Sequence, residues 1–285
     1  KWWGDLWLSE STSNFLSFVA LKETLQRQDT VIFELLSTKF QGHIEDQFSV
    51  SHPLAMDIKN ISEALASFDD ITSRKGAAVL KQLQFVLGGT ILKRVLADIT
   101  KTHPYGNITY HNFIESINRT TNASFTQWQQ DWIKSTGSNA IKAEFSCNQE
   151  AKINRLRILQ KPDSHNQLLR THRTRFGLFT KNKSGSYELE SNLDINYRGF
   201  ETFVSNANDS PCPSFIIPNI DGFDYARIRL SRSDFKILQN EFASLEKKKV
   251  KGETIWTLGS NQKGNYIKAE ANAAGSGLGK KIKID

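Results

Sequence analysis

The chain has 285 residues, of which 38% are hydrophobic and 24% are charged, which is typical of a folded globular protein and excludes a disordered or collagen-like chain. No apolar run is long enough to predict a membrane-spanning helix. The net charge of +7 is concentrated in residues 244–285, where nine lysines outnumber four acidic residues, so it indicates a basic tail and not a nucleic-acid-binding surface.

The first half of the sequence is predicted to be helical. Apolar residues recur there at intervals of three and four positions, and Gly88-Gly89 predicts a helix end. Thr109 is suited to cap the helix that follows it. Residues 41–60 are expected to be irregular. Helices are predicted over residues 9–36, 60–68, 71–87, 90–102, 109–118 and 123–135.

The apolar pattern changes to alternation after about residue 140. Pairs such as Leu156/Ile158 and Phe176/Leu178 are separated by clusters rich in Pro, Gly, Asn and Ser. Short strands joined by such turns predict an antiparallel β-sandwich over residues 140–231. A further helix is expected over residues 233–249. Residues 264–279 are too small and polar to build a core, so little tertiary contact is predicted for them.

Cys147 and Cys212 are the only cysteines of the chain. They are isolated and lack C-x-x-C spacing, so they indicate neither a zinc site nor a disulfide framework. The sequence favours buried free thiols at both positions.

The most unusual segment is the first ten residues, in which three tryptophans precede the carboxylate of Glu10. One interpretation of Glu10 is purely structural, because an acid in the first turn of a helix, just after a capping Ser9, complements the helix dipole. The other interpretation depends on the motif around it. This segment resembles the WW-x-D-L-W-L-N-E sequence of the zinc aminopeptidase N family, the gluzincins that include leukotriene hydrolase.

This resemblance implies that Glu10 is the third ligand of a catalytic Zn²⁺. In the family, the other two ligands are the histidines of an upstream H-E-x-x-H helix. The six histidines of this chain include no H-x-x-x-H pair. The expected position of the motif lies before Lys1, so the chain is expected to carry one ligand of three and to be inactive alone.

Further family motifs follow in the family's order. Segments 51–54, 68–77, 103–107 and 132–137 resemble S-H-P-(I/V), F-D-x-I-x-Y-x-K-G-A, H-x-Y-x-N and W-x-x-x-x-G. Later, residues 156–160 and Pro218-Asn219 followed by Tyr225 resemble the β-sandwich that follows the catalytic domain. The implied fold is α+β. The expected units are the C-terminal helical part of a thermolysin-like domain (1–138), an antiparallel β-sandwich (139–231), and a helix with a basic tail (232–285).

One departure from the family pattern concerns catalysis. The family tyrosine before x-K-G donates its phenol O–H to the oxyanion of the transition state, and Ser73 occupies that position here. A serine hydroxyl does not reach as far, so the oxyanion site is expected to be degenerate; loss of one such donor lowers kcat by about 10²–10³-fold. Ser9 and Ser11 replace the Asn and Gly that flank the family's glutamate, and they are expected to alter how Glu10 is held.

The favoured function is therefore part of a zinc-dependent aminopeptidase that removes N-terminal residues from peptides with a free N-terminus. The alternative is a non-catalytic relative that serves as a binding or scaffolding module, because Ser73 has lost the phenol. A nucleic-acid-binding module is disfavoured, since the lysine tail contains few aromatic residues. The oligomeric state and compartment stay open, with the cytoplasm favoured. Asn-x-Ser/Thr patterns at Asn107, Asn118 and Asn122 matter only in a secreted protein.

Overall fold

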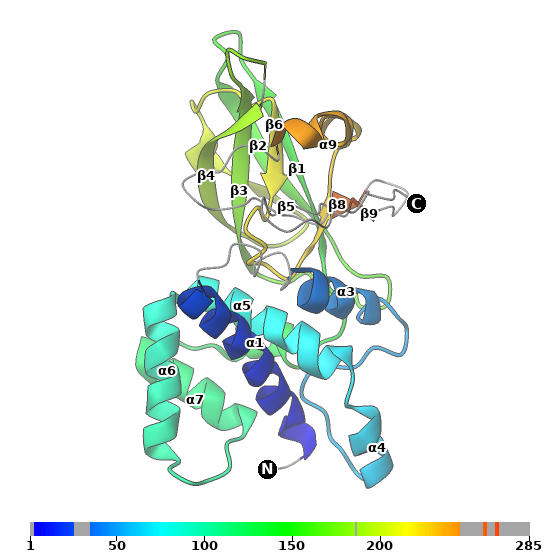
Figure 1. Ribbon diagram of the computed structural model, residues 1–285, viewed down its shortest axis with the longest axis vertical. Coiled ribbons are helices and arrows are strands. Elements are labelled where there is room, and N and C mark those ends of the chain that lie inside the picture. Colours follow the sequence, from blue (N-terminus) through cyan, green and yellow to red (C-terminus); the bar gives the residue numbers. More distant parts are fainter. Residues whose placement is uncertain (1–2, 26–34, 186, 246–258, 261–265, 268–285) are drawn as a thin grey trace.

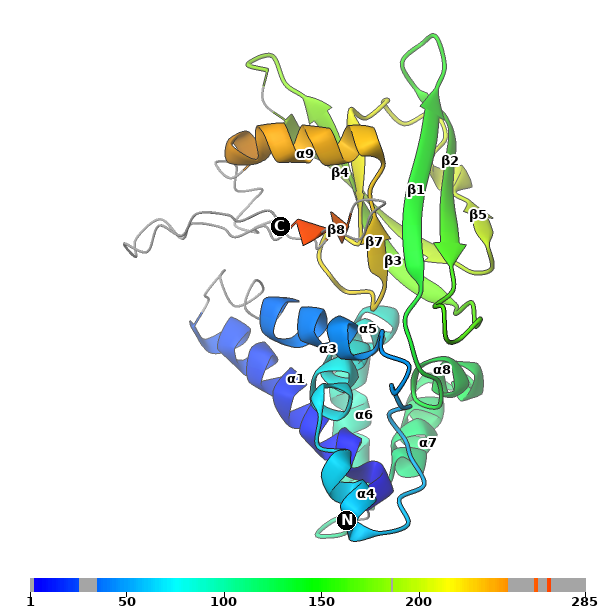
Figure 2. The same cartoon turned by 90° about the vertical axis from the view of Figure 1, so that its right-hand side faces the viewer.

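The computed structural model describes residues 3–25, 35–185, 187–245, 259–260 and 266–267, which form an α+β fold. Helices α1 and α3–α8 gather at one end of the molecule, and strands β1–β7 with helix α9 form the other (Figures 1 and 2). The α-helices are α1 (Leu6–Leu25), α3 (Gln41–Glu45), α4 (Ile61–Ala66), α5 (Gly76–Leu87), α6 (Gly89–Thr102), α7 (Tyr110–Thr121), α8 (Thr126–Trp132) and α9 (Arg232–Leu245). Two short 3₁₀ helices are η1 (Trp3–Asp5) and η4 (Ser205–Ala207), and two short π helices are η2 (Leu35–Phe40) and η3 (Ile71–Lys75).

Several helix ends lie where the sequence predicts them. Gly88 adopts a φ of 86° and separates α5 from α6, a conformation that costs glycine little. Thr109 caps α7 in a reciprocal capping box, and the Asn60 side chain caps α4. Helix α7 continues further than predicted and ends before Asn122, which takes the left-handed conformation with a φ of 52°.

The first helix begins earlier than predicted. Helix α1 starts at Leu6 after the 3₁₀ turn η1, because Leu6 and Trp7 are buried in the core and Asp5 accepts a hydrogen bond from the Tyr110 backbone N–H at 2.8 Å. Glu10 therefore lies in the second turn of α1. The interpretation of Glu10 as a first-turn acid that follows a capping Ser9 is wrong. Part of the predicted helix, residues 26–34, lies outside the described residues.

Two other local predictions need correction. The helix predicted over residues 71–87 consists of the π turn η3 followed by α5. The region 41–60, predicted to be irregular, begins with helix α3. Both differences occur where α3 and η3 pack closely, since a Cβ on Gly42 would lie 2.9 Å from the backbone nitrogen of Lys75. An apolar period cannot reveal such a close tertiary contact.

The strands form two sheets with the orders β5-β2-β1-β7-β8-β9 and β4-β3-β6. Most neighbours are antiparallel, but β1 pairs with β7 in parallel, and β7 with β8 in parallel. Within residues 140–231, where antiparallel pairing is expected, the β1–β7 pair departs from that expectation, because β7 returns beside β1 in the same direction. The strands are β1 (Ala140–Cys147), β2 (Ile153–Lys161), β3 (His172–Lys181), β4 (Tyr187–Tyr197), β5 (Glu201–Phe203), β6 (Phe215–Pro218), β7 (Arg227–Arg229), β8 (Gly259–Ser260) and β9 (Tyr266–Ile267).

Apolar side chains are buried in two clusters. One contains residues of the helical end, such as Trp7, Leu83 and Trp132, together with Tyr225 from the chain segment before β7. The other joins side chains from both sheets, such as Ile158 and Phe176. Helix α9 adds Leu238 to this second cluster. Most of the predicted tail, residues 264–279, lies outside the described residues, as does the end of the predicted helix 233–249.

A buried polar network connects the two ends. Asp46 forms an ion pair with Lys75, whose Nζ lies 2.7 Å from Asp46 Oδ1, and the two side chains are 0% and 1% exposed. The same carboxylate accepts hydrogen bonds from Ser51 Oγ and from the backbone N–H of Gly137. Tyr225 donates its hydroxyl to Asp46 Oδ2 at 3.3 Å. We call these residues the Asp46 network.

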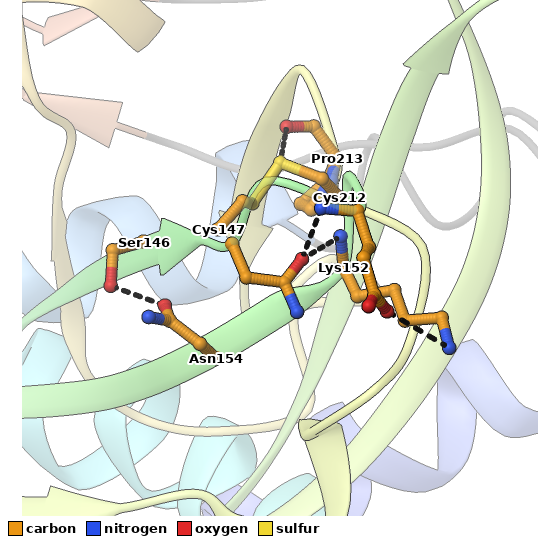
Figure 3. The surroundings of a disulfide bond; sticks show 8 residues. Ser146, Cys147, Lys152, Asn154, Cys212 and Pro213 are labelled. Carbon is orange, nitrogen blue, oxygen red and sulfur yellow. Dashed lines mark hydrogen bonds and ion pairs between the residues drawn. A yellow bond between two sulfur atoms is a disulfide. The ribbon is translucent and has the colours of Figure 1, made fainter.

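The cysteine prediction is wrong. Cys147 at the end of β1 and Cys212 before β6 form a disulfide, with Cα atoms 5.9 Å apart (Figure 3). Backbone hydrogen bonds from Cys212 N to Ala151 O and from Ile153 N to Ser210 O bring the two segments together. The cysteines are separated by 65 positions, and no local spacing pattern marks such a bond.

Candidate functional site

The structure places Ser73 on the face of α1 that carries Glu10. Glu10 and Asn14 are four residues apart in α1 and therefore share one face. Asn14 Nδ2 donates to Ser73 Oγ at 3.4 Å. Ser73 thus lies one helical turn along α1 from Glu10. Asn14 belongs to none of the family motifs, and its spacing of four residues from Glu10 is the signal in the sequence that marks it.

Helix α1 and the η3–α5 segment are in close contact beside this site. Ser11 is fully buried and donates its hydroxyl to the Thr72 carbonyl at 2.7 Å. A Cβ on Gly76 would lie 1.7 Å from Ser11 Oγ, so only glycine allows this approach. Ser11 therefore holds Thr72, and with it the neighbouring Ser73, against α1. In the described structure Ser11 makes no hydrogen bond to Glu10.

Two of the sequence motifs meet at the start of η3. His52 Nε2 lies 2.7 Å from Asp69 Oδ2, and Asp69 Oδ1 accepts the Thr72 N–H at 2.9 Å. Partial burial lowers the pKa of His52, but the hydrogen bonds to Asp69 and to the Pro53 carbonyl outweigh it, so the net pKa is raised. Burial raises the pKa of Asp69, yet the bond from His52 brings it below its usual value. His52 thus links the two segments through Asp69.

A cavity of about 340 Å³ lies on another side of α1. Ser9 lines this cavity, whereas Ser11 faces Thr72. The cavity and the η3 contact therefore lie on different sides of α1. Among the described residues Ser9 makes no side-chain hydrogen bond to Glu10. Other lining residues include Leu8 of α1, Leu96 of α6, Asn107 from the loop between α6 and α7, and Phe113 of α7.

The candidate metal ligand is half-buried. Within the part of the chain that the structure describes, the Glu10 carboxylate has no hydrogen bond and no ion pair. No group of three His, Cys, Asp or Glu side chains that could hold a metal ion occurs among residues 3–25, 35–185, 187–245, 259–260 and 266–267. A zinc site needs three or four protein ligands, so these residues alone do not fit Zn²⁺. No catalytic step through zinc follows from this chain alone.

Other buried histidines do not form a second site. His172 Nδ1 lies 2.7 Å from Asp224 Oδ1, and both side chains are 0% exposed. Tyr197 donates its hydroxyl to Asp224 Oδ2, so both carboxylate oxygens of Asp224 have buried partners. This cluster contains no nucleophile. Burial holds the pKa of His43 well below its usual value, and the positive charge of nearby Lys39 lowers this pKa further. These groups stabilise the contact between the two ends of the molecule.

Comparison with known proteins identifies the class. Residues 1–132 match the model of the peptidase family M1 domain. An aminopeptidase N from Streptomyces lividans is 23% identical over 246 residues, which cover 84% of this chain and 29% of that protein. Aminopeptidase M1 of Arabidopsis thaliana is 23% identical over 240 residues, covering 82% and 27%. The probable aminopeptidase 2 of Sulfurisphaera tokodaii is 25% identical over 210 residues, covering 74% and 24%.

The matched region contains the segment around Glu10 and Ser73, and the relatives are named as aminopeptidases. Residues 1–132 therefore match peptidase family M1, and a larger part of the chain is similar to aminopeptidases. It spans less than a third of the length of these relatives. In the described residues no helix is long and apolar enough to cross a membrane.

Proposed function

We propose that this chain contributes part of the active site of a zinc-dependent aminopeptidase. Its substrates are peptides with a free N-terminus. Glu10 is one zinc ligand, and two histidines of an H-E-x-x-H segment outside this sequence are the others. The proposed units are the C-terminal helical part of a thermolysin-like catalytic domain (1–138), a β-sandwich (139–231), and a helix with a basic tail (232–285).

The observation that carries this proposal is the common face of Glu10, Asn14 and Ser73. A carboxylate used as a metal ligand must remain available, and Glu10 is half-buried without a partner in the described structure. The position of the oxyanion donor must lie near the same face, and Ser73 Oγ is held there by Asn14. The tight Ser11–Gly76 contact fixes the distance between the two segments. These features support the proposal, because they bring the two candidate site residues into one small region.

Ser73 makes the proposed enzyme a slow member of its family. A catalytic donor must approach the oxygen that becomes negatively charged in the transition state. A serine hydroxyl extends less far from the backbone than a phenol, and Ser73 Oγ already interacts with Asn14. We propose that the reaction proceeds without this direct donor. A non-catalytic binding role is the outcome if the other half of the site is also degenerate.

The chain of residues 1–285 alone is expected to bind no stoichiometric zinc at micromolar concentrations, because one carboxylate cannot compete with water and buffer for the ion. Isothermal titration calorimetry with zinc, followed by metal analysis after gel filtration, checks this expectation. Glu10→Ala is the matched variant. Tight binding of one zinc per chain that is lost in Glu10→Ala would contradict the shared site and show that this chain forms a complete one.

A further inference from the structure

The chain contains repeated acceptor patterns for N-linked glycans. This pattern is Asn-x-Ser/Thr with any residue except proline in the middle. It occurs at Asn60, Asn107, Asn118, Asn122, Asn182 and Asn208. A glycan is bulky, so a usable acceptor in the folded protein must point to solvent without displacing a contact.

Asn122 meets this condition in the helical end. It follows the last residue of α7 in the left-handed conformation, and it is exposed together with Ala123 and Ser124. Its carboxamide makes no hydrogen bond in the described structure. A sugar attached to Nδ2 would therefore extend away from the turn between α7 and α8 without disturbing either helix.

Asn208 meets the same condition in the sheet end. It follows η4 and is exposed, as is the neighbouring Asp209. Its backbone N–H donates to the Ser205 carbonyl at 3.1 Å, which fixes the turn. No hydrogen bond of its side chain occurs among the described residues. The backbone is thus held while the carboxamide remains free.

Asn118 provides a contrast within the same protein. It is half-buried, and its Oδ1 accepts the Phe125 backbone N–H at 2.8 Å across the turn that Asn122 begins. A glycan on Asn118 Nδ2 would be attached to the same carboxamide whose oxygen accepts this hydrogen bond. The structure therefore distinguishes an exposed acceptor from a half-buried one only four residues away.

The disulfide is an independent observation that indicates a secretory compartment. Cys147 and Cys212 are bonded, and Cys212 lies four residues after Asn208 (Figure 3). Stable disulfides are typical of secreted and secretory-pathway proteins and are rare in the reducing cytosol. The lumen of the secretory pathway is also where proteins receive N-linked glycans. The disulfide therefore favours an oxidising compartment over the cytoplasm.

We propose that this protein matures in an oxidising secretory compartment and carries N-linked glycans at Asn122 and Asn208. The donor is a lipid-diphosphate-linked oligosaccharide, and a transferase of that compartment catalyses the reaction. Asparagine Nδ2 forms a bond to the anomeric carbon of the first sugar while the bond from that carbon to the diphosphate oxygen breaks. The lipid diphosphate leaves with the electron pair, and Nδ2 loses one proton to a base. No oxidant or reductant is needed for this step.

The test uses the 285-residue chain with a cleavable secretion signal, expressed in eukaryotic cells. Peptide mapping before and after glycosidase treatment measures the occupancy of each acceptor. Ser124→Ala and Ser210→Ala remove the patterns of Asn122 and Asn208 while keeping both asparagines. Each variant is expected to lose one glycan. Thr120→Ala, which removes the pattern of Asn118, is expected to leave the glycan number unchanged.

The same peptides are then examined in protein isolated from its natural source. Glycans at Asn122 and Asn208, together with a Cys147–Cys212 cross-link in the unreduced digest, support the proposal. Unmodified Asn122 and Asn208 in the natural protein would overturn it, even if the recombinant chain is glycosylated. Unmodified peptides from chains retained inside the expressing cells would also count against it, so failure of secretion does not leave the proposal untested.

Discussion

Ser73→Tyr is expected to raise kcat by about 10–10³-fold in a longer protein that contains this chain together with an H-E-x-x-H segment. The phenol would donate to an oxygen that carries negative charge mainly in the transition state, so KM is expected to change little. The smaller gain applies if a bound water already replaces the missing donor. Initial-rate kinetics with an aminoacyl anilide substrate measure both constants.

Ser73→Phe is the matched control for this substitution. Phenylalanine fills similar space but has no hydroxyl, so it is expected to give no gain in kcat. Equal gains from Tyr and Phe would show that packing against α1, and not hydrogen-bond donation, limits the wild-type protein. If Ser73→Tyr gives no gain and the starting protein is as fast as ordinary family members, another group supplies the donor. The proposed degenerate oxyanion site would then be wrong.

Lys75→Met is expected to lower the free energy of unfolding by about 3–5 kcal/mol, because it leaves the Asp46 carboxylate buried without its cation. Lys75 and Asp46 are 1% and 0% exposed and 2.7 Å apart. Burial lowers the pKa of Lys75, and Asp46 offsets part of that effect. The remaining hydrogen bonds from Ser51, Gly137 and Tyr225 carry no full positive charge. Urea denaturation followed by tryptophan fluorescence measures the loss.

Arg74→Met is the control for the buried ion pair. Arg74 forms an ion pair with Asp70 at 3.1 Å, but the side chains are 37% and 35% exposed. Exposed pairs contribute about 0–1 kcal/mol, so this neighbouring variant is expected to remain near wild-type stability. A loss in Lys75→Met no larger than in Arg74→Met would contradict the importance of the Asp46 network.

Much of the helical architecture could be predicted because its signals are local. The positive φ of Gly88 and the capping box of Thr109 depend on residues within one or two turns. The strand regions were predictable for the same reason, since Leu156 and Ile158 alternate within β2 and are both buried. Ser73, which lies in one of the family motifs, contacts Asn14 of α1.

The missed features all depend on contacts between distant segments. Tyr225 and Asp46 are 179 positions apart, and the cysteines are 65 positions apart, so neither pairing has a local pattern. Ser11 is the neighbour of Glu10 in sequence. Successive residues of a helix point in different directions, however, and Ser11 faces Thr72. The parallel pairing of β1 with β7 likewise depends on how the chain returns to the sheet.

The most direct test of the proposed site is the zinc content of the longer protein with Glu10→Gln. The amide keeps the size of the side chain but removes the negative charge that a zinc ligand supplies. Glu23→Gln is the control on the same helix, since among the described residues Glu23 forms only an exposed ion pair with Lys93. Plasma mass spectrometry after dialysis is expected to find one zinc per molecule in the wild type and in Glu23→Gln, and none in Glu10→Gln. Full zinc retention by Glu10→Gln would contradict the assignment of Glu10 as a ligand.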